Sequence, residues 1–128
     1  MIYLDSCILI YALEDSSHRG DIVRAALSNT DHVVATSPLV MHECLVGPLK
    51  AQDLELKQRY IELFADMHQL EIDSACFLLA AEIRALHGLR TPDALHLAAA
   101  QLAVCDELWT NDRRFLSASR GMAVNLLD

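Results

Sequence analysis

The sequence predicts an α/β fold: a three-layer sandwich in which helices flank both faces of a mostly parallel central sheet. Short apolar runs alternate along the chain with segments whose apolar residues recur at helical spacing, a pattern typical of such sheets. The chain has 128 residues, of which 53% are hydrophobic, which is enough for one real core. Because it contains no repeat, linker or low-complexity segment, we expect residues 1–128 to form a single domain.

The first third of the chain predicts two strands, at residues 2–4 and 32–35, which are short apolar runs. Between them, residues 8–13 and 21–27 carry apolar side chains at helical spacing and predict two short helices. The first strand ends at Asp5, so a carboxylate stands at the junction between a buried strand and an apolar helix.

A clear helix start follows the second strand. Ser37 can cap a helix and Pro38 suits the first helical position. We expect this helix to contain Glu43 and to end near the sequence Gly47-Pro48, because proline interrupts helical hydrogen bonding.

The middle of the chain predicts two longer helices. Residues 53–68 place their apolar side chains on one helical face, and residues 70–72 form a minimal strand after it. The next helix is capped by Asp73 and ends at Gly88, a residue type that commonly terminates helices.

The last third repeats the alternation. Thr91 and Pro92 open a helix rich in alanine and leucine that runs to about residue 104. A strand at residues 107–110, a short helix capped at Asn111-Asp112 and a final strand at 122–126 complete the pattern.

Composition narrows the function classes. The longest apolar stretch is far shorter than the roughly 20 residues that cross a membrane, and the N-terminus lacks the basic region of a signal peptide. The four cysteines form no C-x-x-C pair, so we interpret them as buried reduced thiols rather than disulfides or a zinc site. These features predict a cytoplasmic protein without membrane association.

The net charge of −8 argues against a nucleic-acid partner, since affinity for phosphates comes mainly from cations. Carboxylates that hold divalent cations would account for several of these charges, and a bound metal would reverse their local effect. A basic partner protein could also complete the surface.

Four carboxylates stand where α/β folds gather their chemistry, at strand ends and the helix starts beside them: Asp5, Glu43, Asp93 and Asp112. Each alone has an ordinary explanation, because aspartates often cap helices and a helical glutamate is usually solvated. Asp5 and Asp93, however, interrupt strongly apolar surroundings, where an uncompensated charge is costly. Four converging carboxylates predict an all-oxygen site for Mg²⁺ or Mn²⁺, and these ions suit phosphodiester hydrolysis.

The sequence resembles the PIN-domain nucleases and is most similar to the VapC toxins of type II toxin–antitoxin systems. The segments that carry the resemblance are IYLDS (2–6), SPLVMHE (37–43), TPDALHLAA (91–99) and LWTNDRRF (108–115). Their order and intervals match over essentially the whole chain. The resemblance implies a PIN fold, Mg²⁺- or Mn²⁺-dependent endoribonuclease activity on RNA, inhibition by a cognate antitoxin protein, and a homodimer.

The resemblance also implies roles for individual residues. Asp5 and Asp93 correspond to the principal metal ligands, Glu43 completes the acidic cluster, and Asp112 fills a fourth and more variable position. The hydroxyl groups of Ser6 and Thr110 match positions that hydrogen-bond the acids or water. Cys7 departs from the family pattern, in which asparagine or serine is frequent, and a thiol is a poorer hydrogen-bonding partner.

Three further residues are candidates for contact with RNA. His96 lies one helical turn after Asp93, although packing or a structural hydrogen bond is the more common role for such a histidine. Arg113 and Arg114 follow Asp112 and could bind the phosphate backbone, or could simply be solvated at a helix start.

Two rival functions remain open from the sequence. The first is a catalytically silent PIN-fold interaction module, which the negative net charge and the presence of Cys7 favour. The second is an α/β phosphatase or phosphoacceptor with Asp5 as nucleophile, which is disfavoured because position 7 is not acidic.

Overall fold

A computed structural model describes residues 1–127. Its central feature is a five-stranded sheet in the order β3-β2-β1-β4-β5, in which every neighbouring pair is parallel. The predicted α/β class and PIN-like sandwich are confirmed. The strands are β1 (Ile2–Leu4), β2 (Val34–Thr36), β3 (His68–Gln69), β4 (Glu107–Thr110) and β5 (Ala123–Asn125).

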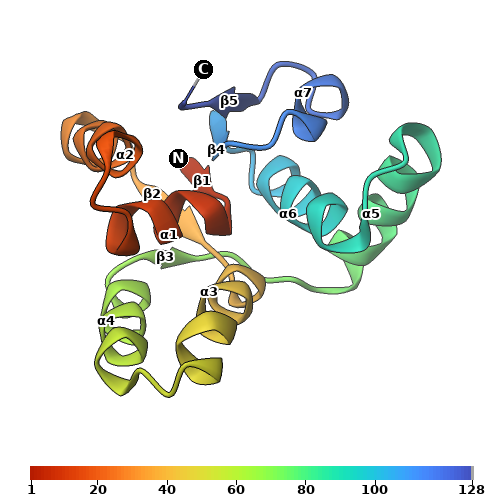
Figure 1. Ribbon diagram of the computed structural model, residues 1–128. Coiled ribbons are helices and arrows are strands. Elements are labelled where there is room, and N and C mark those ends of the chain that lie inside the picture. Colours follow the sequence, from red (N-terminus) through yellow and green to blue (C-terminus); the bar gives the residue numbers. More distant parts are fainter. Residues whose placement is uncertain (128) are drawn as a thin grey trace.

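Helices cover both faces of this sheet (Figure 1). α1 and α2 lie on one side and α5 and α6 on the other, while α3 and α4 extend beyond the β3 edge. None of the helices in the described part of the chain is long and apolar enough to cross a membrane. The helices are α1 (Ser6–Glu14), α2 (His18–Asn29), α3 (Pro38–Lys50), α4 (Leu54–Ala65), α5 (Ser74–His87), α6 (Thr91–Leu102) and α7 (Arg114–Ala118).

The edge strand β3 is displaced from its predicted position. The sequence pattern placed a strand at 70–72, whereas the strand is His68–Gln69, and α4 ends before it at Ala65. Pairing with β2 sets this position, because Ala35 lies opposite His68 and the amide of Leu70 donates to the Thr36 carbonyl at 2.8 Å. The apolar pattern of the sequence correctly indicated that Leu70 is buried, but it could not show where this segment pairs with β2.

The prediction that α3 ends near Gly47-Pro48 was wrong, because the helix continues to Lys50 with Pro48 inside it. A residue before proline normally avoids the helical region because its Cβ meets the proline ring, and Gly47 has no Cβ. Pro48 is buried and its carbonyl accepts a hydrogen bond from Asp53 at 2.9 Å. Packing and this turn therefore offset the lost helical hydrogen bond.

The core surrounds the central strand β1, whose three residues are all buried. Side chains alternate between the two faces of a strand, so Ile2 and Leu4 point away from the face that receives Tyr3. Tyr3 packs against His96 of α6, with ring centroids 5.7 Å apart. A tyrosine thus occupies the middle of the sheet on the side of α6.

The joint between α1 and α2 requires glycine at position 20. A Cβ atom there would lie 1.8 Å from the carbonyl oxygen of Asp15, which is backbone and cannot move aside freely. Arg24 secures the same joint by donating to the carbonyls of Asp15 at 2.8 Å and Ala12 at 3.0 Å. The close approach therefore fixes how α2 turns back along α1.

We predict that Gly20→Ala lowers the free energy of unfolding by about 1–3 kcal/mol, as overpacking commonly does. Urea denaturation followed by circular dichroism measures this. Ser28→Ala, which introduces the same residue at an exposed position of α2, is the matched control and should change stability by less than about 0.5 kcal/mol. Equal effects of the two substitutions would contradict the steric explanation.

Candidate active site

Asp5 lies where β1 passes into α1, and the local structure holds its carboxylate at three points. One oxygen accepts from the Ser6 amide at 2.8 Å; the other accepts from the Thr110 hydroxyl at 2.8 Å and more weakly from the Cys7 thiol at 3.6 Å. The residue is only 8% exposed. This burial raises the pKa of the Asp5 carboxyl, although nearby His96 and the bonds from Thr110 and Ser6 act in the opposite direction.

Glu43 approaches Asp5 from α3, the helix that Ser37 caps. Its carboxylate is half-buried and lies 2.5 Å from Nε2 of His96, on α6. One potential ligand atom from each of Asp5, Glu43 and His96 falls within 4.8 Å of the other two. These atoms are close enough together to surround a single ion, but Nε2 of His96 is already paired with Glu43.

Asp93 occupies the first turn of α6 and is 6% exposed. Its carboxylate accepts from Nε of Arg90 at 3.0 Å, and a second guanidinium, that of Arg114, lies 3.7 Å away. Two arginines thus compensate a buried negative charge at the start of an apolar helix.

Asp112 follows β4 and is tied to both Thr110 and Arg114. Its amide donates to the Thr110 hydroxyl at 3.0 Å, so this one hydroxyl connects Asp5 with Asp112. Nε of Arg114 lies 2.9 Å from each oxygen of the Asp112 carboxylate. These hydrogen bonds hold the pKa of the Asp112 carboxyl below its usual value.

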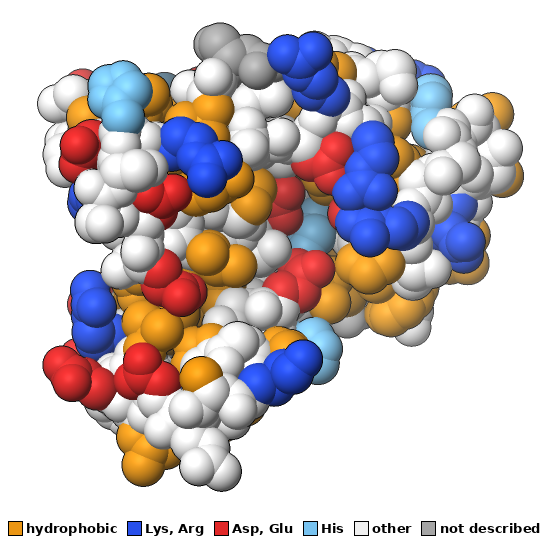
Figure 2. Space-filling view, viewed as in Figure 1, with side chains coloured by type: hydrophobic (Ala, Val, Ile, Leu, Met, Phe, Trp, Pro, Cys, Tyr) orange, Lys and Arg blue, Asp and Glu red, His pale blue; other side chains and the backbone are white. Residues whose placement is uncertain are grey.

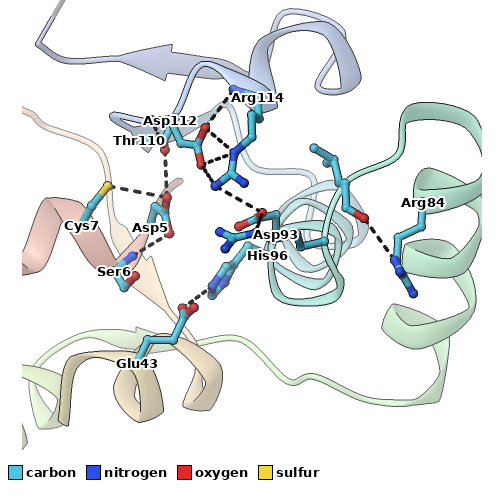
Figure 3. Close-up of polar contacts among 12 residues, drawn as sticks. Asp5, Ser6, Cys7, Glu43, Arg84, Asp93, His96, Thr110, Asp112 and Arg114 are labelled. Carbon is cyan, nitrogen blue, oxygen red and sulfur yellow. Dashed lines mark hydrogen bonds and ion pairs between the residues drawn. The ribbon is translucent and has the colours of Figure 1, made fainter. Parts of the chain in front are cut away.

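The four predicted acids line one cleft, which has a volume of about 370 Å³. Figure 3 shows them converging from four segments, with Asp5 between Asp112 on one side and Glu43 on the other. In the space-filling view, acidic side chains gather around a hollow between α1 and α6, and basic side chains border it on the side of α6 (Figure 2). The cleft lies beyond the carboxyl ends of β1 and β4, where parallel sheets commonly bind ligands.

The other predicted residues occupy more varied positions. Thr110 bonds Asp5 through its hydroxyl, whereas Ser6 does so through its backbone amide. His96 is 0% exposed, so in this conformation it offers no surface to an RNA phosphate; its ring contacts Tyr3 and Glu43 instead. Arg113 and Arg114 are both exposed, and Arg113 lines the cleft.

Tyr11 and Asn111 also line the cleft, and sequence reasoning did not identify them. The Asn111 amide donates to the Tyr11 hydroxyl at 3.1 Å, which closes one wall of the cleft. Tyr11 lies one helical turn after Cys7 and so shares its face of the helix. This spacing is the sequence feature that could have placed Tyr11 near the site. Cys7 itself has its pKa raised to about 12, chiefly by burial, so it remains a thiol that can donate to Asp5.

Comparison with known proteins agrees with this geometry. The family model of the PIN domain matches residues 2–121. The chain belongs to the PIN-domain family. No curated protein matches it significantly in sequence. The resemblance to PIN-domain proteins, predicted from four segments, is confirmed.

Solved structures of toxin–antitoxin proteins share the fold of this PIN domain. A toxin–antitoxin complex from Klebsiella pneumoniae superimposes with a TM-score of 0.81 at 25% identity, covering 98% of both chains. VapBC2 from Rickettsia felis, bound to a promoter DNA fragment, gives 0.80 at 22% identity and 98% of both chains. Mycobacterium tuberculosis VapC20, described as a sarcin–ricin loop cleaving toxin, gives 0.80 at 15% identity, covering 92% of this chain and 95% of that one.

We predict that Asp5→Asn stabilises the metal-free PIN domain at neutral pH by about 0.5–2 kcal/mol, the range typical of a single stabilising substitution. The folded protein holds the Asp5 proton more tightly than the unfolded chain, whose pKa is near 3.8. This contribution to stability is complete below about pH 3.8 and is lost as pH rises through the folded-state pKa. The advantage of Asp5→Asn should therefore grow with pH.

Chemical denaturation in EDTA at several pH values measures this difference. Asp112→Asn is the matched comparison from the same cleft and should destabilise at neutral pH, because the pKa of Asp112 is lowered rather than raised. A destabilised Asp5→Asn protein at neutral pH would contradict the burial argument.

Proposed function

We propose that this PIN domain is a metal-dependent endoribonuclease that hydrolyses RNA phosphodiester bonds with Mg²⁺ or Mn²⁺, and that it is the toxin of a toxin–antitoxin pair. The observation that carries the proposal is the convergence of Asp5, Glu43, Asp93 and Asp112 on one cleft. The description of VapC20 as a sarcin–ricin loop cleaving toxin, and of the neighbour from Klebsiella pneumoniae as a toxin–antitoxin complex, supports it.

The chemistry of the donor atoms fits a hard divalent cation. Burial disfavours the charged form of Asp5, and neighbouring Glu43 disfavours it further, so a cation there would relieve both costs. Since Nε2 of His96 is already bonded to Glu43, the donors facing the cleft are carboxylate oxygens, which Mg²⁺ and Mn²⁺ prefer. Asp5, Glu43 and Asp93 would hold the ion, with Asp112 beside them.

Such an ion lowers the pKa of an attacking water and stabilises charge on the leaving oxygen. The chain's own groups prepare the cleft for this reaction. Thr110 and the Ser6 amide keep the Asp5 carboxylate in one orientation. Arg113 and Arg114 are exposed at the cleft and suit the RNA phosphates, which would offset locally the net charge of −8.

An apolar hollow outside the cleft is the proposed binding site for an antitoxin partner. This hollow has a volume of about 410 Å³ and is lined by side chains of α1, α2 and α4, among them Leu9, Leu27 and Leu63. Apolar side chains of a partner helix would fill it. We also propose a homodimer that acts in the cytoplasm, and the exposed residues Phe77 and Leu78 of α5 support an interface there.

The arginine pairs favour one alternative function, a catalytically silent interaction module. Arg90 and Arg114 satisfy Asp93 and Asp112 without any metal, which is also how purely structural acids are compensated. Activity measurements separate the two functions.

We predict that the purified protein cleaves RNA with Mg²⁺ or Mn²⁺, that EDTA abolishes cleavage, and that Asp5→Asn and Asp93→Asn each reduce it at least about 100-fold. The reason is that losing a group that merely supports a metal ligand already costs about 10–100-fold. A fluorescent panel of structured RNAs provides the assay, and Asp31→Asn, an exposed aspartate outside the cleft, is the control.

Expression in a bacterium tests the same proposal without knowledge of the RNA target. The parent should arrest growth, and Asp5→Asn should not. Full activity of both Asp5→Asn and Asp93→Asn would refute the carboxylate mechanism. A folded parent that cleaves no RNA and arrests no growth would favour the interaction module.

A further inference from the structure

A buried chain of hydrogen bonds ends at Glu43. The reaction proposed above gives no role to the other residues of this chain. The Ser37 hydroxyl lies 2.8 Å from the Tyr3 hydroxyl, which lies 2.6 Å from Nδ1 of His96; Nε2 of His96 lies 2.5 Å from Glu43. Ser37, Tyr3 and His96 are all 0% exposed. Of these four residues only Glu43 lines the cleft. Figure 3 shows the bond between Glu43 and His96.

The chemistry of the four groups gives this chain of hydrogen bonds a direction. An ionised carboxylate only accepts, so Nε2 of His96 carries the hydrogen that is donated to Glu43. In the neutral ring Nδ1 is then an acceptor and takes the hydrogen of the Tyr3 hydroxyl. With the ring neutral, the Tyr3 oxygen then accepts from Ser37, because its own hydrogen is used at Nδ1. In this arrangement each group donates toward Glu43, and hydrogen bonds arranged in such a chain polarise one another.

The chain of hydrogen bonds also joins three separate elements of the fold. Tyr3 belongs to β1, the middle strand of the sheet, His96 belongs to α6, and Ser37 caps α3, the helix that bears Glu43. The rings of Tyr3 and His96 are closely packed and cannot reorient without disturbing the core. The position of Glu43 is consequently tied to the buried central strand β1 as well as to α3.

A packing role by itself does not require these residue types. Phenylalanine would fill the site of Tyr3 without burying a hydroxyl, and leucine would suit the apolar run around His96 without burying an imidazole. The polar groups become useful if the position of the Glu43 carboxylate matters, because groups that hydrogen-bond a metal-binding carboxylate or imidazole fix its orientation.

We propose that Tyr3 and His96 are positioning residues that hold the Glu43 carboxylate in the geometry required to bind the catalytic cation. This inference rests on the proposed function, since it assigns Glu43 to that cation. Neither residue touches the cation or the RNA; both act through Glu43.

The test measures Mn²⁺ binding to the full-length protein by isothermal titration calorimetry, alongside RNA cleavage and thermal unfolding. Tyr3→Phe should weaken Mn²⁺ binding about 10-fold or more, within the range of about 10–100-fold expected for such support. His96→Leu should do the same. His96→Gln, whose amide can donate where Nε2 does, should recover part of the affinity that His96→Leu loses.

Tyr60→Phe is the matched control. Tyr60 is also fully buried and its hydroxyl also contacts a glutamate, Glu14 at 2.5 Å, but neither residue lines the cleft. This substitution should leave Mn²⁺ affinity unchanged, even if it lowers the unfolding temperature as much as Tyr3→Phe does.

A double-mutant comparison separates positioning from a general structural effect. In a Glu43→Gln background, Tyr3→Phe should cause little further loss of Mn²⁺ affinity, because the group being positioned has already been changed. An undiminished loss in that background would overturn the inference, as would unchanged affinity in both Tyr3→Phe and His96→Leu. If Glu43→Gln weakens Mn²⁺ binding while those two variants do not, only this inference fails. A parent that neither binds Mn²⁺ nor cleaves RNA overturns the proposed function and this inference with it.

Discussion

The cleft depends on the hydrogen bonds that keep the Asp5 carboxylate in place at the end of the central strand. Asp5 is desolvated, and it is tolerated because the Ser6 amide and the Thr110 hydroxyl donate to it. Thr110 ends β4, the strand paired with β1, so sheet pairing itself supplies the donor. The same hydroxyl accepts from Asp112 and thereby sets a second acid relative to the first.

The remaining acids illustrate two ways of stabilising negative charge in one cleft. Asp93 and Asp112 are compensated by arginines, which neutralise them and hold the pKa of Asp112 low. Glu43 instead pairs with the buried imidazole of His96. The donors that hold Asp5, the Ser6 amide and the Thr110 hydroxyl, carry no formal charge, so the side of the cleft formed by Asp5 and Glu43 is better suited to a cation than the side whose acids pair with arginines.

Stability and function are in tension at these positions. Desolvation of a carboxylate and proximity to a second one both disfavour folding, and they persist where the site has a use for them. The PIN fold limits the cost by placing the acids at strand ends and helix starts, where backbone amides and neighbouring elements can reach them.

Local patterns in the sequence determined the order of strands and helices, the helix starts at Ser37 and Thr91, and the identity of the four acids. This was possible because hydrophobic periodicity, helix caps and interruptions of apolar runs each involve only residues close together in the sequence. The tertiary structure alone decided what depends on distant partners. The position of β3 came from pairing with β2, and the passage of α3 through Pro48 came from packing. The hydrogen bonds of His96 with Tyr3 and Glu43 required β1, α3 and α6 to meet. Asp5 was identifiable from the sequence, but one of the two main hydrogen bonds that allow it to remain buried comes from Thr110, 105 positions away.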